Sequence, residues 1–250
     1  LWQRRIPPVE GIRRPQPRAL AGKSFALLLP LCGVACALLL AAAAQNSQPV
    51  QDSVGNSLWL GLCSAAIGAV ICLLWLALGP SRFGEWIWLP LILPALPLVD
   101  GQYQLALYTW LDGERLTVLW GHLLWVVPWM LFILRPAWRA RDPRAELVAR
   151  TLGWQRGRIF WLVTLPALTR PLLTALAVGF SVSIAQYLPT LWLGGGRVAT
   201  LTSEAVALSS GGDTSTLAAQ ALWQLLLPAL FFAATALLAW LIGHYRQRIR

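Results

Sequence analysis

Few side chains in this sequence have the chemistry of catalysis or metal binding, and they do not gather. The two histidines, His122 and His244, lie far apart in the chain and have no carboxylate close by. The four cysteines all lie within apolar runs and form no Cys-x-x-Cys pair, a setting typical of small buried hydrophobic residues. We therefore expect no catalytic site, no metal site and no enzyme activity, and we interpret His122 as a packed or interfacial residue.

One stretch resembles the end of a nucleotide-binding loop. Residues 21–24 read Ala-Gly-Lys-Ser, but a phosphate-binding loop needs a glycine five residues before Gly22, and this chain has Pro17 there. No strand pattern precedes the stretch, as that loop also requires. We expect this chain to bind no cofactor itself.

The composition places the chain in a membrane. Hydrophobic residues make up 57% and charged residues only 12%, whereas a soluble domain carries about 25% charged residues. Several apolar runs approach the roughly 20 residues that a helix needs to cross a bilayer, and they lack the alternation of a β-barrel. The net charge is +10. Membrane proteins collect positive residues in their cytoplasmic segments, which accounts for this charge without a nucleic-acid partner, and we expect none.

We expect an all-α, polytopic membrane protein with six transmembrane helices in a domain over residues 24–243. The expected spans are residues 24–44, 58–78, 86–110, 116–134, 171–192 and 217–243. A basic arm (1–23) precedes the domain, a long polar loop (135–170) interrupts it, and a short tail (244–250) follows it. The first span is interpreted as a retained helix rather than a cleaved signal, because its apolar run is too long for a signal peptide.

The distribution of Lys and Arg predicts the orientation. With the N-terminus inside the cell, cytoplasmic segments hold 18 of these residues and the opposite side holds 2. Positive residues collect on the cytoplasmic side of membrane proteins. Both termini of this segment and the loop 135–170 are therefore expected in the cytoplasm.

Within that loop, residues 142–166 read as two short helices joined by a glycine. Asp142 and Pro143 suit the start of a helix, and Gly153 suits its end. The apolar stripe of the first helix is expected to be Ala145, Val148, Ala149 and Leu152. The second helix is expected over 155–163, ending at Thr164-Leu165-Pro166 because proline disfavours helix in the residue before it.

These residues resemble the permease subunits of type I ATP-binding-cassette importers. Their cytoplasmic loop carries an acidic residue, two small residues, a glycine, and then a β-branched residue followed by Leu-Pro. Residues 146–153 are similar to the first part and residues 163–166 to the second, with ten positions from Gly153 to Val163. Leu147-Val148 stands where the family usually has Glu-Ala or Ala-Ala. The six-helix layout and Asn56-Ser57-Leu58 at the start of the second span also fit.

The resemblance implies a bacterial inner-membrane permease whose first loop helix is a coupling helix for an ATPase. It implies two ATPase subunits that carry ATP and magnesium, a second permease half, and a periplasmic substrate-binding protein. The chain looks nearest the thiamine, iron(III) and polyamine branch, and the arm 1–23 suits a linker that follows a similar permease half. The implied ATPase-coupling residues are Glu146, Ala149, Gly153, Val163, Leu165 and Pro166.

Two alternatives to this interpretation stay open. The loop helix can instead lie among lipid headgroups, with its arginines on anionic lipid. The protein can instead be an ion-coupled secondary transporter, although that mechanism needs charged groups at mid-membrane and the chain offers at most Asp100.

Polar residues near the spans are candidates for function because they are costly in a membrane. Candidates for the translocation path are Asp100, Gln102, Gln186 and Tyr187. Asp100 lies either inside the third span or in an outer loop, and Gln186 is alternatively an interhelical hydrogen-bond partner. The expected outer loop 194–216, rich in Gly and Ser, is either mobile or contacts the periplasmic protein through Arg197, Glu204 and Asp213.

Overall fold

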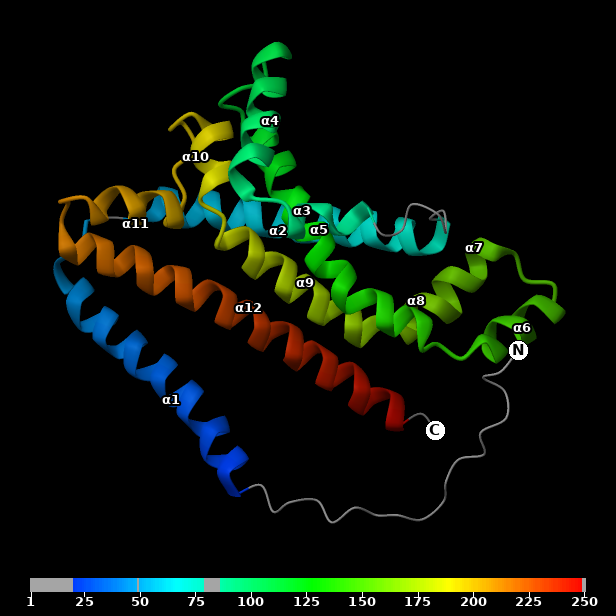
Figure 1. The fold of residues 1–250 in the computed structure, drawn as a ribbon. Helices are drawn as coiled ribbons and strands as arrows, with labels where there is room; N and C mark the ends of the chain where they lie inside the picture. The colour runs from blue at the N-terminus through cyan, green and yellow to red at the C-terminus, as the bar shows by residue number, and fades with distance from the viewer. Residues whose placement is uncertain (1–19, 49, 79–85, 249–250) are drawn as a thin grey trace. The chain divides into compact units, whose positions relative to one another are not determined.

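The computed structural model describes residues 20–48, 50–78 and 86–248, of which residues 20–29 and 246–248 are described by their backbone alone. The chain divides into two units, Leu1–Leu39 and Leu40–Arg250. The first contains most of α1 (Leu20–Ala43), an apolar helix close to the first predicted span. Residues 1–19 of the predicted basic arm lie outside the described residues. Figure 1 shows the elements in chain order.

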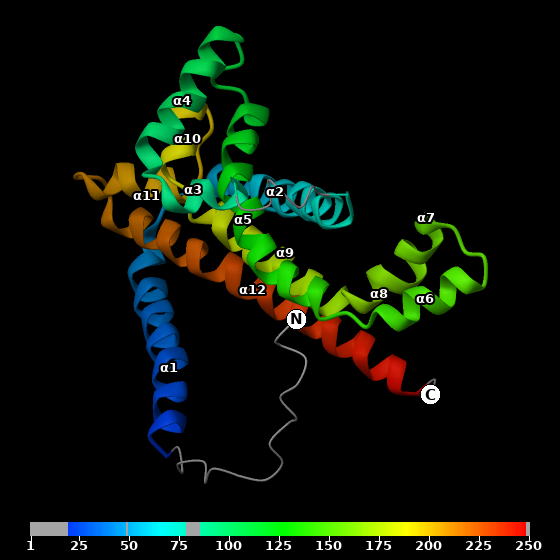
Figure 2. The same ribbon diagram turned by 45° about the vertical axis from the view of Figure 1, so that its right-hand side comes forward.

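Helix α9 is the centre of the second unit. It packs against α2, α5 and α12, and the turned view in Figure 2 shows the same long helices crossing around it. These four are α2 (Gln51–Leu78), α5 (Arg115–Arg139), α9 (Thr169–Ile184) and α12 (Thr214–Arg248). The shorter helices are α3 (Leu89–Ile92), α4 (Ala95–Tyr108), α6 (Pro143–Thr151), α7 (Arg156–Ile159), α8 (Leu165–Ala167), α10 (Leu188–Gly194) and α11 (Leu201–Ser209). Single turns are η2 (Ala44–Asn46), η3 (Trp86–Trp88) and the π-helical η4 (Phe160–Thr164).

The described residues contain no strand, so the all-α prediction is confirmed. Three helices in this part of the chain are long and apolar enough to cross a membrane: α2, α5 and residues 214–245 of α12. A fourth span results if residues 156–167 and 169–184, which meet at a bend of 74°, are counted as one. The number six therefore stays a prediction.

The third predicted span, 86–110, is broken into η3, α3 and α4. Leu93, the residue before Pro94, is extended, with φ −79° and ψ 148°, because the proline ring disfavours helical backbone in its predecessor. Pro94 then precedes the first residue of α4. Asp100 lies inside α4 and is exposed, so it is not in a loop.

The expected outer loop 194–216 is largely helical, which corrects that prediction. The predicted span 171–192 ends earlier, at Ile184, and α10 and α11 follow it. Helix α11 begins with a capping box: Thr200 and Ser203 each accept a hydrogen bond from the other's backbone N–H. The side chain of Leu201 is fully buried, and the Thr202 hydroxyl donates to the Ile184 carbonyl at 2.6 Å. Local capping and burial therefore outweigh the glycine and serine content.

Small residues allow the central helices to approach closely. The buried ring of Phe180 on α9 lies against Gly61 of α2 and stacks on Phe231 of α12, with ring centroids 4.4 Å apart. A β-carbon at Gly61 would lie 2.7 Å from Cε2 of Phe180. Close packing over small residues is a main source of helix association inside membranes.

We expect Gly61→Val to destabilise the helical bundle. The new side chain meets Phe180, which is fully buried and stacked on Phe231, and overpacking of this kind costs about 1–3 kcal/mol. The matched control is Gly55→Val on the same helix, where nothing lies within 4 Å of an added β-carbon. Thermal unfolding in detergent should give a lower midpoint for Gly61→Val only; equal midpoints would contradict the packing argument.

Candidate functional site

Helix α6 is capped at both ends by its own sequence, as predicted. The Asp142 carboxylate accepts a hydrogen bond from the backbone N–H of Arg144 at 2.9 Å. At the other end, Gly153 adopts φ +77°. The N–H of Gly153 then bonds to the Arg150 carbonyl at 3.0 Å and that of Trp154 to the Ala149 carbonyl at 3.1 Å. This is a Schellman motif, which ends a helix on a left-handed residue.

The second helix of the loop, predicted over residues 155–163, differs from the prediction. The helix does not end at Thr164-Leu165-Pro166 but continues through Pro166 to Ala167, and the chain bends after it, at Leu168. The π-helical turn η4 precedes the proline, and the Leu165 N–H bonds five residues back, to the Phe160 carbonyl. A π turn shifts the hydrogen-bond register. This shift makes room for the Pro166 ring, which would otherwise clash with a backbone carbonyl of the preceding turn.

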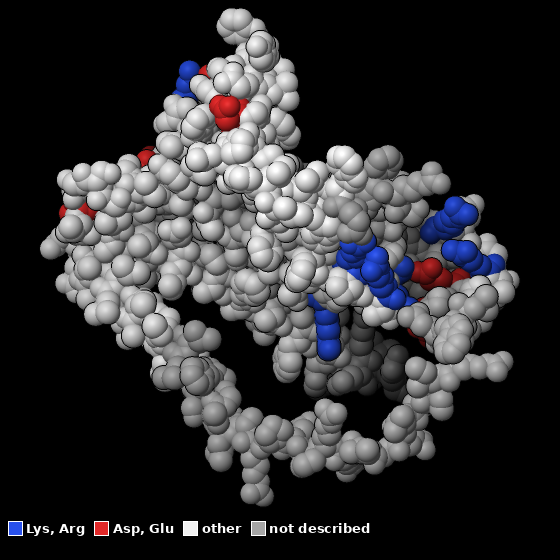
Figure 3. All heavy atoms as spheres, viewed as in Figure 1, with Lys and Arg blue, Asp and Glu red and all other residues white. Residues whose placement is uncertain are grey.

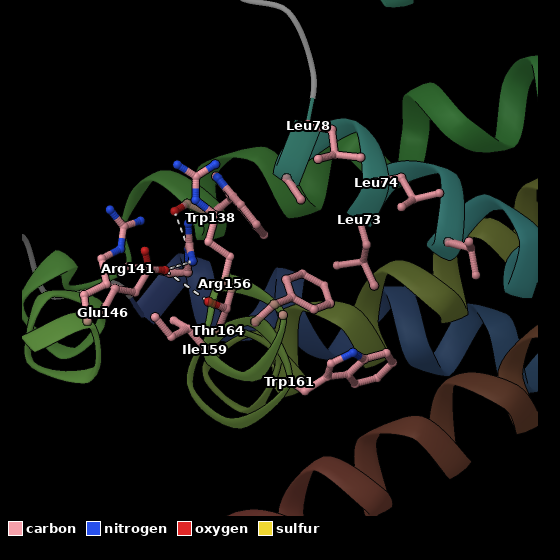
Figure 4. A pocket seen from close by; sticks show the side chains of 15 residues that line it. Leu73, Leu74, Leu78, Trp138, Arg141, Glu146, Arg156, Ile159, Trp161 and Thr164 are labelled. Atoms are coloured by element: carbon pink, nitrogen blue, oxygen red, sulfur yellow. Dashed lines mark hydrogen bonds and ion pairs between the residues drawn. The ribbon is translucent and has the colours of Figure 1, made fainter. Parts of the chain in front are cut away.

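Glu146 connects three elements (Figure 4). Its Oε1 accepts hydrogen bonds from Arg141, just beyond the end of α5, and from the Thr164 hydroxyl of η4 at 3.1 Å. The Arg141 guanidinium also lies over the Trp138 ring, 3.7 Å from its centroid, and donates to the Trp138 carbonyl at 2.9 Å. The carboxylate of α6 is thereby tied to the end of one long helix and to the segment that leads into α9.

The faces of α6 differ from the predicted stripe. Ala149 is 5% exposed and faces inward, while Val148 and Leu152 are 59% and 67% exposed. Leu147 is exposed as well. The inward turn of Ala149 places it on the same broad side as Glu146, because positions three apart share a helix face. Ala145, also in the predicted stripe, is exposed. The outward apolar surface of α6 therefore consists of Ala145, Leu147, Val148 and the C-cap residue Leu152, without Ala149.

The remaining predicted coupling residues lie on the path from α6 to α9. Gly153 is exposed at the joint between α6 and α7. Val163, Leu165 and Pro166 are half-buried in η4 and α8. The structure thus brings Glu146 to the Leu-Pro segment through Thr164, which the sequence analysis had not selected.

The four candidates for a translocation path do not gather in one place. Asp100 is exposed and Gln102 is buried on the same helix, so they lie on different sides of α4. Gln186 donates from Nε2 to the His122 carbonyl at 3.1 Å. Tyr187 is half-buried beside it, at the start of α10. The Oε1 atoms of Gln102 and Gln186 are buried and have no partner among the described residues.

A polar cluster surrounds His122 and was not predicted from the sequence. The ring is 1% exposed, its Nδ1 lies 2.8 Å from the Ser183 hydroxyl, and its Nε2 lies 2.9 Å from the Thr190 hydroxyl. Ser183 also donates to Ser64 at 3.3 Å. The cluster joins α2, α5, α9 and α10. His122 is packed, as expected. The sequence did contain one indication of the cluster, because each of these apolar helices carries a polar residue.

We expect His122→Leu to lower the stability of the bundle. The change removes one hydrogen bond from each of Ser183 and Thr190, which keep their bonds to Ser64 and to the Gln186 carbonyl. A lost hydrogen bond of this kind costs about 0.5–1.5 kcal/mol. Adding Ser183→Ala and Thr190→Val should restore part of the loss, since removing both sides of a hydrogen bond is less costly than removing one side. Thermal unfolding in detergent measures both, and a triple variant less stable than His122→Leu would contradict the hydrogen-bond explanation.

The three candidates for receptor contact have different surroundings. The Arg197 side chain is exposed and lies over Gly113, in the turn between α4 and α5. Glu204 is half-exposed in the first turn of α11. The Asp213 carboxylate accepts from the Thr216 hydroxyl at 2.5 Å and the Ser215 hydroxyl at 2.7 Å. These bonds, with one from the Ser215 backbone, lower the pKa of Asp213 to about 2, and the residue is engaged at the start of α12.

Comparison with known proteins supports the predicted class. Residues 24–250 match the family described as "Binding-protein-dependent transport system inner membrane component". The inner membrane ABC transporter permease protein YnjC of Escherichia coli (strain K12) is 57% identical over 249 residues, which cover 100% of this chain and 49% of that protein. The chain thus spans about half the length of this relative. The predicted resemblance is confirmed, and the chain belongs to the family of inner-membrane permease components of binding-protein-dependent ABC transport systems.

Proposed function

We propose that this permease component moves a small solute into the cell, driven by ATP hydrolysis on partner subunits and supplied by a periplasmic binding protein. Helix α6 is the coupling helix on which the ATPase acts. The active assembly contains two ATPase subunits and a second permease half. ATP and magnesium are bound by the ATPase subunits.

The observation that carries this proposal is the three-way connection at Glu146. A partner that pushes on α6 moves a helix with stable caps and a carboxylate that holds both Arg141 and Thr164. The displacement is passed to α5 through Arg141 and to α9 through η4 and α8. Rigid helices with discrete contacts can transmit such a movement, as in alternating access.

The proposed orientation places α6 and both termini of this segment in the cytoplasm. Figure 3 shows Lys and Arg side chains gathered over the part of the second unit that carries α6 and α7. The arginines on these two helices are Arg144, Arg150, Arg156 and Arg158. Such an excess of positive charge beside the apolar helices supports a cytoplasmic location.

The outward apolar surface of α6 provides the test. We expect Val148→Asp to release the ATPase, because a charge at a buried interface loses its hydration without a partner. The matched control is Val206→Asp, the same change at an exposed valine on α11. The full-length protein is purified from its own host, and the ATP-hydrolysing activity that co-purifies is measured. Equal ATPase activity with both variants would remove α6 as the docking element.

The alternative, an ion-coupled secondary transporter, is tested in the same preparation. In proteoliposomes that contain the purified complex, we expect uptake to require ATP and to be unaffected by collapsing ion gradients. Uptake that follows an ion gradient without ATP would favour the alternative.

For the periplasmic partner, we propose Arg197 and Glu204 as the contact residues. Arg197 is exposed and Glu204 is half-buried, whereas the Asp213 carboxylate is engaged in capping α12. For the path, Gln186 has the best support among the four candidates, because its buried Oε1 has no partner in the described part of the chain and its Nε2 adjoins the His122 cluster.

A further inference from the structure

A pocket of about 660 Å³ lies beside α6, with apolar side chains on one side and arginines on the other (Figure 4). One side is the C-terminal half of α2, with Leu74 and Leu78, together with Trp161 of η4. The other side carries arginines at the α6 and α7 end, including Arg150 and Arg156. Figure 4 shows the labelled leucines and the labelled arginines at opposite ends of the pocket.

The charges at the basic end are not balanced. Arg141 is paired with Glu146, the single carboxylate among the residues that line the pocket. Arg150 and Arg156 are exposed, and neither guanidinium has a hydrogen-bond or ion-pair partner within the described residues. Two guanidinium groups are therefore available to an anion, and their planar forks bind phosphate oxygens well.

The apolar end is as open as the basic end. Leu78 is 79% exposed and Trp161 is 65% exposed, and Leu74 beside them is exposed as well. A free phosphate or other soluble anion would satisfy the arginines and leave this surface uncovered. A ligand with an anionic head and hydrocarbon chains would cover both ends.

We propose that this pocket binds an anionic phospholipid of the surrounding membrane. The phosphate is held by Arg150 and Arg156, and an acyl chain lies along Leu74, Leu78 and Trp161. Basic pockets between helices at the cytoplasmic surface are suited to anionic headgroups. The inference goes beyond the proposed function, because it requires only that α6 and α7 lie at a membrane surface and not that they contact an ATPase.

The experiment is native mass spectrometry of the full-length protein, titrated with phosphatidylglycerol or phosphatidylcholine. The wild type should prefer phosphatidylglycerol. The double variant Arg150→Gln with Arg156→Gln should bind it about 25-fold more weakly, since each arginine near a membrane surface is worth roughly fivefold in affinity. The matched control is Arg144→Gln with Arg158→Gln, which removes the same charge from the same two helices outside the pocket.

A second pair of measurements separates a lipid from a free anion. Leu74→Gln should weaken phosphatidylglycerol binding and leave the binding of inorganic phosphate unchanged. Unchanged lipid affinity in Leu74→Gln would assign the site to a soluble anion and overturn the proposal. Equal losses in the two arginine pairs, or no preference for phosphatidylglycerol in the wild type, would also overturn it.

Discussion

Glu146→Lys is expected to abolish ATP-driven transport while the protein still inserts into the membrane. The change replaces a carboxylate that accepts from Arg141 and Thr164 with an ammonium that faces the Arg141 guanidinium. Breaking a fully buried ion pair costs about 3–5 kcal/mol. The side chains here are 17% and 25% exposed, so solvent reduces that figure. The larger consequence is that α6 loses its connection to α5 and η4.

Transport in proteoliposomes and co-purifying ATPase activity are the two measurements for this change. The control is Glu114→Lys, the same substitution at an exposed glutamate that makes no side-chain cap. A charge exchange, Arg141→Glu with Glu146→Arg, restores an ion pair and should recover part of the transport. If Glu146→Lys transports like the wild type, the Glu146 connection has no role in coupling.

Gly153→Val is expected to uncouple ATP hydrolysis from transport. Gly153 adopts φ +77°, where a β-carbon costs roughly 1–2 kcal/mol and a β-branched residue is a genuine outlier. The strain is relieved by opening the Schellman motif that joins the end of α6 to Trp154. A partner that moves α6 would then move a helix with a loosened joint. ATP should still be hydrolysed, with less solute moved per ATP.

Alanine substitutions isolate the backbone effect from the size of the side chain. Gly153 and Gly157 both have open space around an added β-carbon, but only Gly153 of the two has positive φ. Gly153→Ala should therefore reduce transport, whereas Gly157→Ala, in a helix, should be neutral or slightly stabilising. Gly153→Asn should retain more transport than Gly153→Ala, because asparagine tolerates the left-handed conformation. Equal transport in all three variants would contradict a role for the left-handed conformation of Gly153 in coupling.

Much of the site was predictable because its contacts are local. The cap at Asp142 involves a backbone N–H two residues away, and the Gly153 motif spans the last turn of α6. Hydrogen bonds of this range depend on neighbouring residues alone. The helical class was also predictable, since a chain with so few charges must bury its backbone polar groups in helices within a membrane.

The expectations that failed involved competition between local preference and packing. Pro166 reads as a helix end, yet the π turn before it lets the helix continue to Ala167. Residues 194–216 read as a loop, yet buried Leu201 and the capping box hold α11 there. At Pro166 the compensation is a shifted hydrogen-bond register, and at α11 it is a capping box together with burial of Leu201. Residue patterns alone show neither the shifted register nor the burial.

The sequence by itself determined the class of the protein, the ends of α6 and the resemblance that its family match confirmed. Only the tertiary structure decided that Glu146 reaches Thr164, 18 residues on, and that Ala149 turns inward. It also decided that His122 meets hydroxyls from α9 and α10. The physical reason is range: caps and composition act within a few residues, whereas these partners become neighbours only when the helices pack against one another.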